Sequence, residues 1–223
     1  MPTIESSPTK DGMVQSYLQS SWASLRTQTG TQYRAVTDNQ RDAGAVFVFY
    51  DVGMRGTSFG MVRAFFNFDT SGITEAPASA TLNFYGYYRN DLDVIAVAAD
   101  YMPSLTTADW QAIRGAEEEF AASDGAGAGT LDSAIDVKVY SEKFTSWNPD
   151  GYNTANITAT GLNSLVTEDD WQICLMEYDY DFLDIEPPVA SNLTGLYWGD
   201  ADSGRRPYID YTLAGAAVTD NAT

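Results

Sequence analysis

The chain has 223 residues, with 12 Lys and Arg against 31 Asp and Glu, so its formal net charge is −19. It contains no histidine and one cysteine, which excludes Ser-His-Asp triads, Cys-His pairs, imidazole zinc sites and internal disulfides. Nucleic acids and anionic membranes bind positive surfaces, so we expect neither as a partner. Asp outnumbers Glu by 22 to 9 and Arg outnumbers Lys by 9 to 3. This bias suits a marine or halophilic medium, and a merely acidic surface is the alternative.

The length and the apolar content fit one domain with a substantial core. The sequence contains no run of 18 apolar residues, so no membrane-spanning helix is predicted. The first residues lack the basic and apolar regions of a signal peptide, so we expect no such leader.

Short runs of β-branched, aromatic and alternating residues, separated by Gly, Asn, Asp, Ser and Pro, indicate strands along most of the chain. Residues 107–110 and 161–166 have brief helical patterns, and we expect these short helices to cross between sheets. Many strands with few helices predict an all-β antiparallel sandwich or a barrel. The predicted strands are 45–50, 61–68, 79–88, 93–99, 136–140, 153–160, 171–182, 193–198 and 207–213.

Three segments differ from this pattern. Residues 1–10 and 214–223 are polar and rich in small side chains, and we expect an N-terminal arm and a C-terminal tail that are mobile in isolation. Residues 115–133 combine a triple Glu with alternating Gly and Ala, which predicts an exposed insertion loop or, alternatively, a contact arm. The single domain is then expected over residues 11–213.

Carboxylates are the only abundant acid-base groups in the chain. Glu177, Asp179 and Asp181 alternate in a predicted strand and would line one of its faces. Such a row is typical of a solvated face or an ion site, and a glycosidase pair is the alternative. We expect no catalytic residues and no enzymatic activity.

Asp200 and Asp202 lie in an Asp-x-Asp-x-Gly segment, a pattern that also occurs in calcium loops. The twelfth position counted from Asp200 is a tyrosine, so the segment is not an EF-hand. We predict that this segment forms a polar turn, and the alternative is that it binds a structural Ca²⁺. No other cofactor is expected.

The chain has fourteen Tyr, ten Phe and five Trp, and the alternative to a surface role is that at least half of them lie in the core of the sandwich. Candidate ligand or interface aromatics are Tyr85, Tyr87, Tyr88, Tyr178 and Tyr180, because exposed aromatic rings stack on sugars and anchor protein contacts. Cys174, in an apolar strand, is expected to be an inert core thiol. Arg63 interrupts another apolar run, which predicts a buried or half-buried ion pair that joins two strands, with a ligand-binding role as the less favoured alternative.

The stretch from Arg63 to Ile73, followed after a short loop by Ser79-Ala80-Thr81-Leu82, resembles the core motif of DNRLRE-type jelly-roll domains. A tryptophan near the middle and a closing Pro-Tyr strand are similar to that family as well. The resemblance covers roughly residues 11–213. The motif residues are Arg63, Phe66, Phe68, Asp69, Ser71, Trp147, Pro207 and Tyr208.

The resemblance implies a jelly-roll sandwich related in fold to carbohydrate-binding modules. Family members occur in secreted bacterial surface proteins and in virions of tailed viruses. Without a leader or an attached catalytic domain, this chain looks most like a virion structural protein: a capsid decoration or fibre-type protein on the outer surface, forming homo-oligomers and contacting other virion proteins. The alternatives are a carbohydrate-binding module or adhesin that recognises glycans and, far behind, a carboxylate-based hydrolase or lyase.

Overall fold

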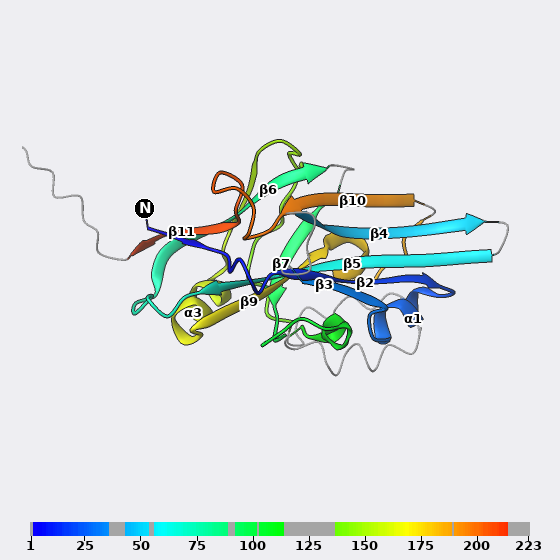
Figure 1. Cartoon of the computed structure of the whole chain (residues 1–223), viewed down its shortest axis with the longest axis horizontal. Helices are drawn as coiled ribbons and strands as arrows, with labels where there is room; N and C mark the ends of the chain where they lie inside the picture. Colours follow the sequence, from blue (N-terminus) through cyan, green and yellow to red (C-terminus); the bar gives the residue numbers. More distant parts are fainter. Residues whose placement is uncertain are drawn as a thin grey trace, which may run out of the picture.

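A computed structural model describes residues 2–35, 43–53, 56–88, 92–101, 103–113, 137–188 and 190–213. Within these ranges the chain forms antiparallel strands joined by short helices, as Figure 1 shows. The strands are β1 (Thr3–Glu5), β2 (Gly12–Gln19), β3 (Gln32–Ala35), β4 (Ala43–Gly53), β5 (Gly56–Asp69), β6 (Pro77–Tyr88), β7 (Val94–Ala98), β8 (Tyr152–Asn156), β9 (Asp170–Glu177), β10 (Ala190–Tyr197) and β11 (Tyr208–Leu213). The helical elements are α1 (Trp22–Thr27), the 3₁₀ helix η2 (Thr107–Gln111), α3 (Ala159–Thr167) and the π-helical turn η3 (Tyr178–Phe182).

The strands form two layers. Sheet A contains β1, β11, β6 and β8, with β6 between β11 and β8. Sheet B contains β3, β2, β5, β4 and β10, and the second half of β5 also pairs with β9, which pairs with β7. Strand β10 reaches the end of β6 and so connects the two sheets. The predicted all-β antiparallel sandwich is confirmed.

Strand β5 is buried on both faces over most of its length, and this divides the core in two. One set of its side chains, including Val62, Phe66 and Phe68, packs between the sheets against Leu82 and Phe84 of β6. The alternate set faces a second core that is closed by α1, η2 and the segment around η3. Strand alternation thus lets one strand serve two hydrophobic layers.

Short polar caps begin the covering helices. Ser21 accepts a hydrogen bond from the backbone N–H of Ser24 at the start of α1. Thr106 and Asp109 form a reciprocal capping box at the start of η2. Thr158 caps α3, which contains the predicted helix 161–166 and buries Leu165.

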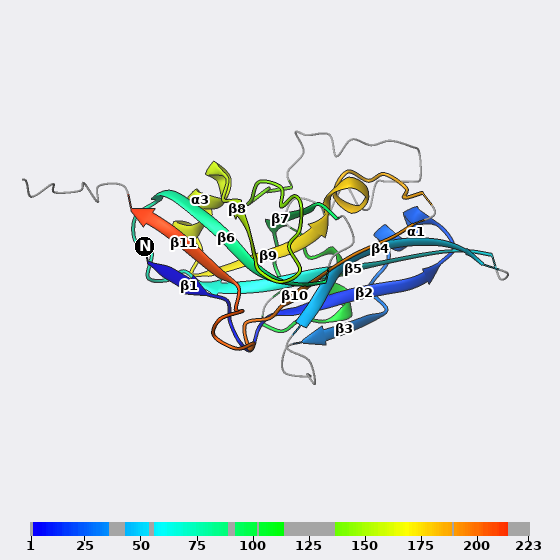
Figure 2. The same cartoon turned by 90° about the horizontal axis from the view of Figure 1, so that it is seen from above.

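Sheet B is longer than sheet A. Figures 1 and 2 both show β2, β4 and β5 extending well past the strands of sheet A toward the right-hand end of the molecule. That end therefore presents a sheet face which sheet A does not cover.

Several predicted boundaries are wrong. Strand 153–160 ends at Asn156, because Thr158 begins a helix, and strand 171–182 ends at Glu177, where the chain turns into η3. Within the described part of 136–140 only an isolated bridge forms, between Val139 and Val97. The prediction missed β2, α1 and β3, in the N-terminal fifth of the chain.

The expected N-terminal arm is partly a strand. Residues 3–5 form β1, which pairs with β11 at the edge of sheet A. The predicted insertion at 115–133 and the predicted tail at 214–223 lie outside the described residues.

Candidate functional site

Five tyrosines form a continuous chain of ring contacts on the outer face of sheet A and the adjoining end of β10. We call this set the tyrosine row. Neighbouring rings meet edge to face, with centroid distances of 5.8, 5.8, 5.2 and 5.0 Å. The row runs Tyr87, Tyr197, Tyr85, Tyr152, Tyr208.

Strand register brings these rings together. Along β6, Ala80, Leu82 and Phe84 face the core, so Tyr85 and Tyr87 face outward. Tyr152 of β8 lies directly opposite Tyr85, and the row continues onto β10 and β11. The row thus crosses four strands.

Hydrogen bonds hold the row in place. The hydroxyl of Tyr85 donates to the backbone carbonyl of Asp150 (2.9 Å), and that of Tyr152 donates to the carbonyl of Arg206 (3.1 Å). Burial raises the pKa of Tyr152 to about 12, with the neighbouring Tyr208 adding to the effect, so this phenol is uncharged at neutral pH. The rings are a pre-ordered surface, because tyrosine has few rotatable bonds to fix.

Arg205 lies over the middle of the row. Its guanidinium carbon is 5.0 Å from the ring centre of Tyr197 and 5.6 Å from that of Tyr85, and Nη1 donates to the Tyr197 hydroxyl (3.2 Å). Among the described residues no carboxylate forms an ion pair with Arg205, whereas the next residue, Arg206, pairs with Glu5. The cation is held by aromatic rings and keeps donors available at the surface.

A second surface lies at the end where sheet B passes beyond sheet A. We call it the aromatic overhang: Tyr17, Leu18, Phe47 and Phe49. Phe47 lies opposite Val62, so it shares the face of sheet B that packs against sheet A farther along. The ring of Tyr17 stacks on Phe49 at 5.9 Å, and Phe47 lies 5.3 Å from Phe49. All three rings are only half-buried.

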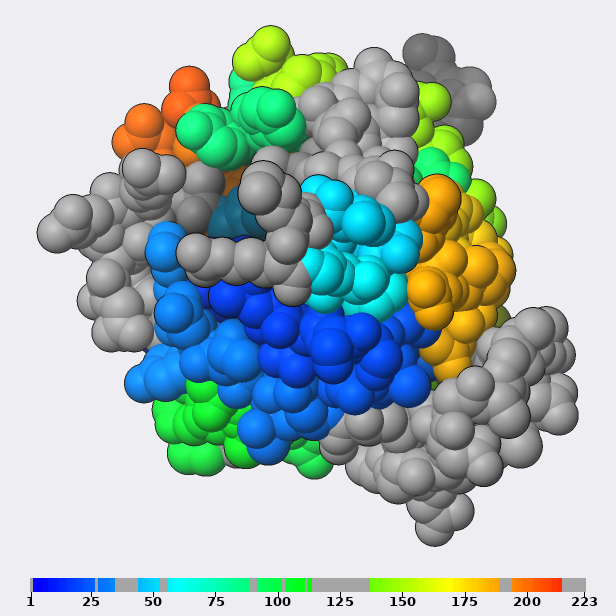
Figure 3. All heavy atoms as spheres, turned by 90° about the vertical axis from the view of Figure 1, so that its right-hand side faces the viewer, coloured from blue at the N-terminus to red at the C-terminus, as the bar shows by residue number. Residues whose placement is uncertain are grey.

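Leu18 is the most exposed large apolar side chain among the described residues, at 80%. A β-bulge between Ser16 and Gln19 inserts one extra residue opposite β5, and Leu18 adopts a left-handed φ of 60° there. That conformation costs a non-glycine residue about 1–2 kcal/mol. Figure 3 looks onto this end, where the N-terminal strands, the start of β5 and the segment after β9 meet at one surface.

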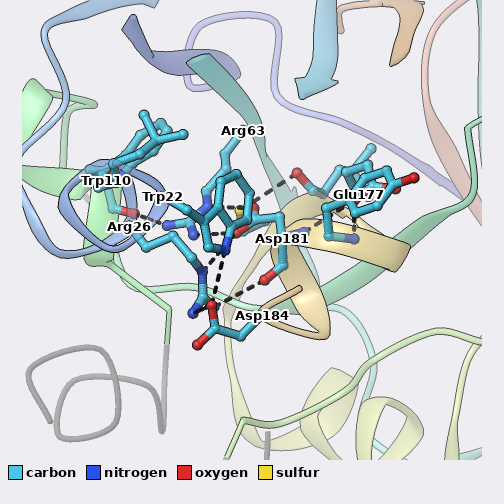
Figure 4. A network of polar contacts seen from close by, with 11 residues as sticks. Trp22, Arg26, Arg63, Trp110, Glu177, Asp181 and Asp184 are labelled. Atoms are coloured by element: carbon cyan, nitrogen blue, oxygen red, sulfur yellow. Dashed lines mark hydrogen bonds and ion pairs between the residues drawn. The ribbon is translucent and has the colours of Figure 1, made fainter. Parts of the chain in front are cut away.

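A buried ionic network lies in the second core (Figure 4). The guanidinium of Arg63 donates to both carboxylate oxygens of Asp181, at 2.8 and 2.6 Å, and lies 4.7 Å from the ring centre of Trp110. Arg26 of α1 donates to the backbone carbonyl of Asp181 and pairs with the carboxylate of Asp184. The predicted buried ion pair of Arg63 is confirmed, but it does not join two strands, because its partner Asp181 lies in the π-helical turn η3.

The predicted carboxylate face of Glu177, Asp179 and Asp181 is wrong. The strand ends at Glu177, whose carboxylate accepts hydrogen bonds from the backbone N–H groups of residues 179, 180 and 181. Asp181 turns inward to Arg63, while Asp179 is exposed. Glu177 caps η3 and Asp181 neutralises an arginine, so both carboxylates have structural partners.

The remaining predicted aromatics lie away from the tyrosine row. Tyr88 is 51% exposed, but strand alternation turns it from the face of Tyr87. Tyr178 stacks on Phe182 within η3, and Tyr180 packs against the second core. Cys174 is a buried thiol, as expected, and burial raises its pKa.

Asp200 and Asp202 lie in an exposed turn between β10 and β11. Among the described residues no group of three or more Cys, Asp or Glu side chains is placed to hold a metal ion. A calcium ion there stays a prediction from the sequence.

The motif residues serve the fold. Phe66, Phe68 and Trp147 are buried between the sheets, and the indole N–H of Trp147 donates to the carbonyl of Gly195. Asp69 accepts from the backbone and hydroxyl of Ser71 in the turn after β5. Pro207 is buried just before β11, and Tyr208 joins the row.

No helix in the described part of the chain is long and apolar enough to span a membrane. A scan against protein-family models finds no match, and a search of curated proteins finds no relative. The jelly-roll resemblance stays a prediction from the sequence.

Proposed function

We propose that this chain is a non-enzymatic structural protein on the outer surface of a tailed-virus particle, acting by protein–protein contacts. The observation that carries the contact mode is Leu18, an 80% exposed leucine in a left-handed conformation, which directly follows Tyr17 in β2. The half-buried ring of Tyr17 stacks on that of Phe49. A partner that covers this aromatic overhang removes its apolar surface from water, and this burial stabilises the complex. The virion setting rests on the resemblance to jelly-roll domains of such particles.

A binding role also agrees with the use of the buried charges. Arg63 and Arg26 form ion pairs with Asp181 and Asp184, and Glu177 caps a turn. These groups support the fold, and their bonds to one another leave little capacity for general acid-base chemistry.

The experiment is a protein inventory of particles purified on a density gradient from the virus that encodes the chain. The proposal expects the chain in amounts stoichiometric with a symmetric shell or tail component, and as a homo-oligomer by light scattering after release. Its absence from purified particles, with expression confirmed in the infected cells, would overturn the proposal.

A further inference from the structure

We infer that the side chains of Lys10 and Asn67 join in an intramolecular isopeptide bond, with Asp170 as the group that transfers the protons. Oδ1 of Asp170 accepts one hydrogen bond from Nζ of Lys10 (2.7 Å) and another from Nδ2 of Asn67 (3.1 Å). A single carboxylate oxygen therefore holds an amine beside a carboxamide, which is the arrangement that amide exchange between the two side chains needs.

Three segments far apart in the sequence bring these groups together. Asn67 lies near the end of β5, and Asp170 begins β9, which pairs with β5. Lys10 lies between β1 and β2, in a segment that runs along β5, since the backbone N–H of Ser7 donates to the carbonyl of Asn67 (2.7 Å). The hydroxyl of Tyr101 donates to the carbonyl of Lys10 (3.1 Å). The fold thus fixes the backbone of all three groups.

The amide is held more firmly than the amine. The side chain of Asn67 is buried, and its backbone N–H donates to the buried carboxylate of Asp11 (3.2 Å). Lys10 and Asp170 line the same open cleft of about 590 Å³, and their side chains are 31% and 48% exposed. The amine can therefore move toward a fixed amide carbon, and the leaving group can escape through the cleft.

Asp170 balances the proton transfers. Its hydrogen bond with the Lys10 ammonium lowers its pKa, so the resting site is an ammonium–carboxylate pair. The carboxylate takes one proton from the ammonium, and the free amine is the nucleophile. Nζ attacks Cγ of Asn67, and the electron pair of the C=O bond moves to the oxygen.

Collapse of this intermediate completes the exchange. Asp170 passes its proton to Nδ2, the Cγ–Nδ2 bond breaks, and the C=O bond forms again. The attacking nitrogen then gives its second proton to Asp170, and the released ammonia carries that proton away as ammonium. No oxidant and no further reactant takes part.

The bond supplies a cross-link that this chain cannot obtain from cysteine, because a single thiol forms no internal disulfide. It joins the segment after β1, at the edge of sheet A, to strand β5 of sheet B. Closing such a loop stabilises the fold by restricting the unfolded chain. The reaction takes place once in each chain, so a slow step suffices and the protein turns over no substrate.

The test is the intact mass of the purified full chain under denaturing conditions, followed during incubation at neutral pH until it is constant. We expect a mass lower than that of the unreacted chain by one ammonia molecule. Trypsin does not cleave after a cross-linked lysine, so a digest should contain one branched peptide, in which the peptide that ends at Arg26 is joined to residues 64–89. A constant mass equal to that of the unreacted chain, or loss of ammonia without the branched peptide, would overturn the inference.

Variants assign the roles of the groups. Lys10→Arg keeps a cation beside Asp170 but supplies no nucleophilic amine, so it should retain the unreacted mass. Asp170→Asn removes the proton-transferring group and should slow the reaction at least about a hundredfold. Asp169→Asn is the matched control, because Asp169 is exposed and lines the same cleft, and it should react as the wild type does.

Circular dichroism checks that each variant folds. Loss of ammonia from the Lys10→Arg variant, or equal rates for the Asp170→Asn variant and the wild type, contradicts the inference. None of these measurements involves virus particles, so their outcome is independent of that of the particle proposal.

Discussion

The guanidinium of Arg63 and the carboxylate of Asp181 face each other with two hydrogen bonds, of 2.8 and 2.6 Å, and both side chains are fully buried. Arg63 belongs to the central strand β5, whereas Asp181 belongs to η3, 118 residues later. The pair ties the covering layer of the second core to the sheet.

Removing the charge of Asp181 should therefore destabilise the fold. Asp181→Asn leaves Arg63 without its anion and weakens the contact with Arg26, and we expect a loss of about 3–5 kcal/mol in the free energy of unfolding. The measurement is a urea titration followed by tryptophan fluorescence. Asp179→Asn, two residues away and exposed, is the control and should change the free energy of unfolding by less than about 0.5 kcal/mol. Equal effects of the two substitutions would show that the ion pair contributes nothing.

Stability should fall as the pH rises toward neutral. Burial raises the pKa of Glu177 from 4.5 to about 7, against the opposing effect of its backbone hydrogen bonds, and burial raises that of Asp11 to about 8. Between the ordinary and the raised pKa values the folded protein binds more protons than the unfolded chain. Its free energy of unfolding therefore decreases with pH, by at most about 1.4 kcal/mol per pH unit for each group.

The Glu177→Gln variant isolates one of these contributions. Glutamine does not ionise, so the free energy of unfolding should decrease less steeply with pH between pH 5 and 7 in the variant than in the wild type. This difference in slope is expected even if the substitution changes the stability by a constant amount at every pH. Urea titrations at four pH values supply the slopes. Parallel curves for the variant and the wild type would mean that Glu177 does not titrate in this range.

Gly86 should not tolerate a side chain. A Cβ atom at this position would stand 1.9 Å from the backbone oxygen of Asn148 and 2.9 Å from the indole nitrogen of Trp147. Gly86→Ala must therefore displace the 147–148 segment, and we expect a loss of about 1–3 kcal/mol in the free energy of unfolding. Gly72→Ala is the matched control, since nothing lies within 4 Å of its Cβ position. Thermal unfolding followed by circular dichroism compares the two, and a Gly86→Ala variant as stable as the Gly72→Ala variant would rule out this close contact.

Leu18 should be dispensable for the stability of the free protein. Glycine accepts a positive φ without strain, and its greater freedom in the unfolded chain offsets that gain, so Leu18→Gly should change the free energy of unfolding by less than about 0.5 kcal/mol. Leu25→Ala, in the buried face of α1, should cost about 2–5 kcal/mol in the same urea titration. A large loss on Leu18→Gly would mean that Leu18 serves the fold and not a partner.

The sequence predicts the sandwich well because strand alternation is a local property. The pattern of Ala80, Leu82 and Phe84 identifies the inward face of β6, and with it the outward direction of Tyr85 and Tyr87. The completion of the row by Tyr152 and Tyr197 could not be predicted, because it depends on which strands become neighbours and in which register.

Around Glu177 the local pattern is misleading. Alternating carboxylates suggest one strand face, yet Glu177 ends the strand by accepting backbone hydrogen bonds, and Asp181 is drawn inward by Arg63. The sequence indicates that a buried Arg63 needs an anionic partner. It does not indicate that this partner is Asp181, 118 residues later in the chain. The bulge at Leu18 likewise depends on the register between β2 and β5.

The most direct test of the proposed function is rebinding to virus particles that have been stripped of this chain. Purified wild type, Leu18→Asp and, as a matched control, Val52→Asp would be incubated with stripped particles and sedimented together. Val52 is a 57% exposed apolar residue near the tip of β4. We predict that the wild type and the Val52→Asp variant bind to saturation at a fixed copy number, and that Leu18→Asp weakens binding at least tenfold. Undiminished binding of the Leu18→Asp variant, or no saturable binding of the wild type, would contradict docking through the aromatic overhang.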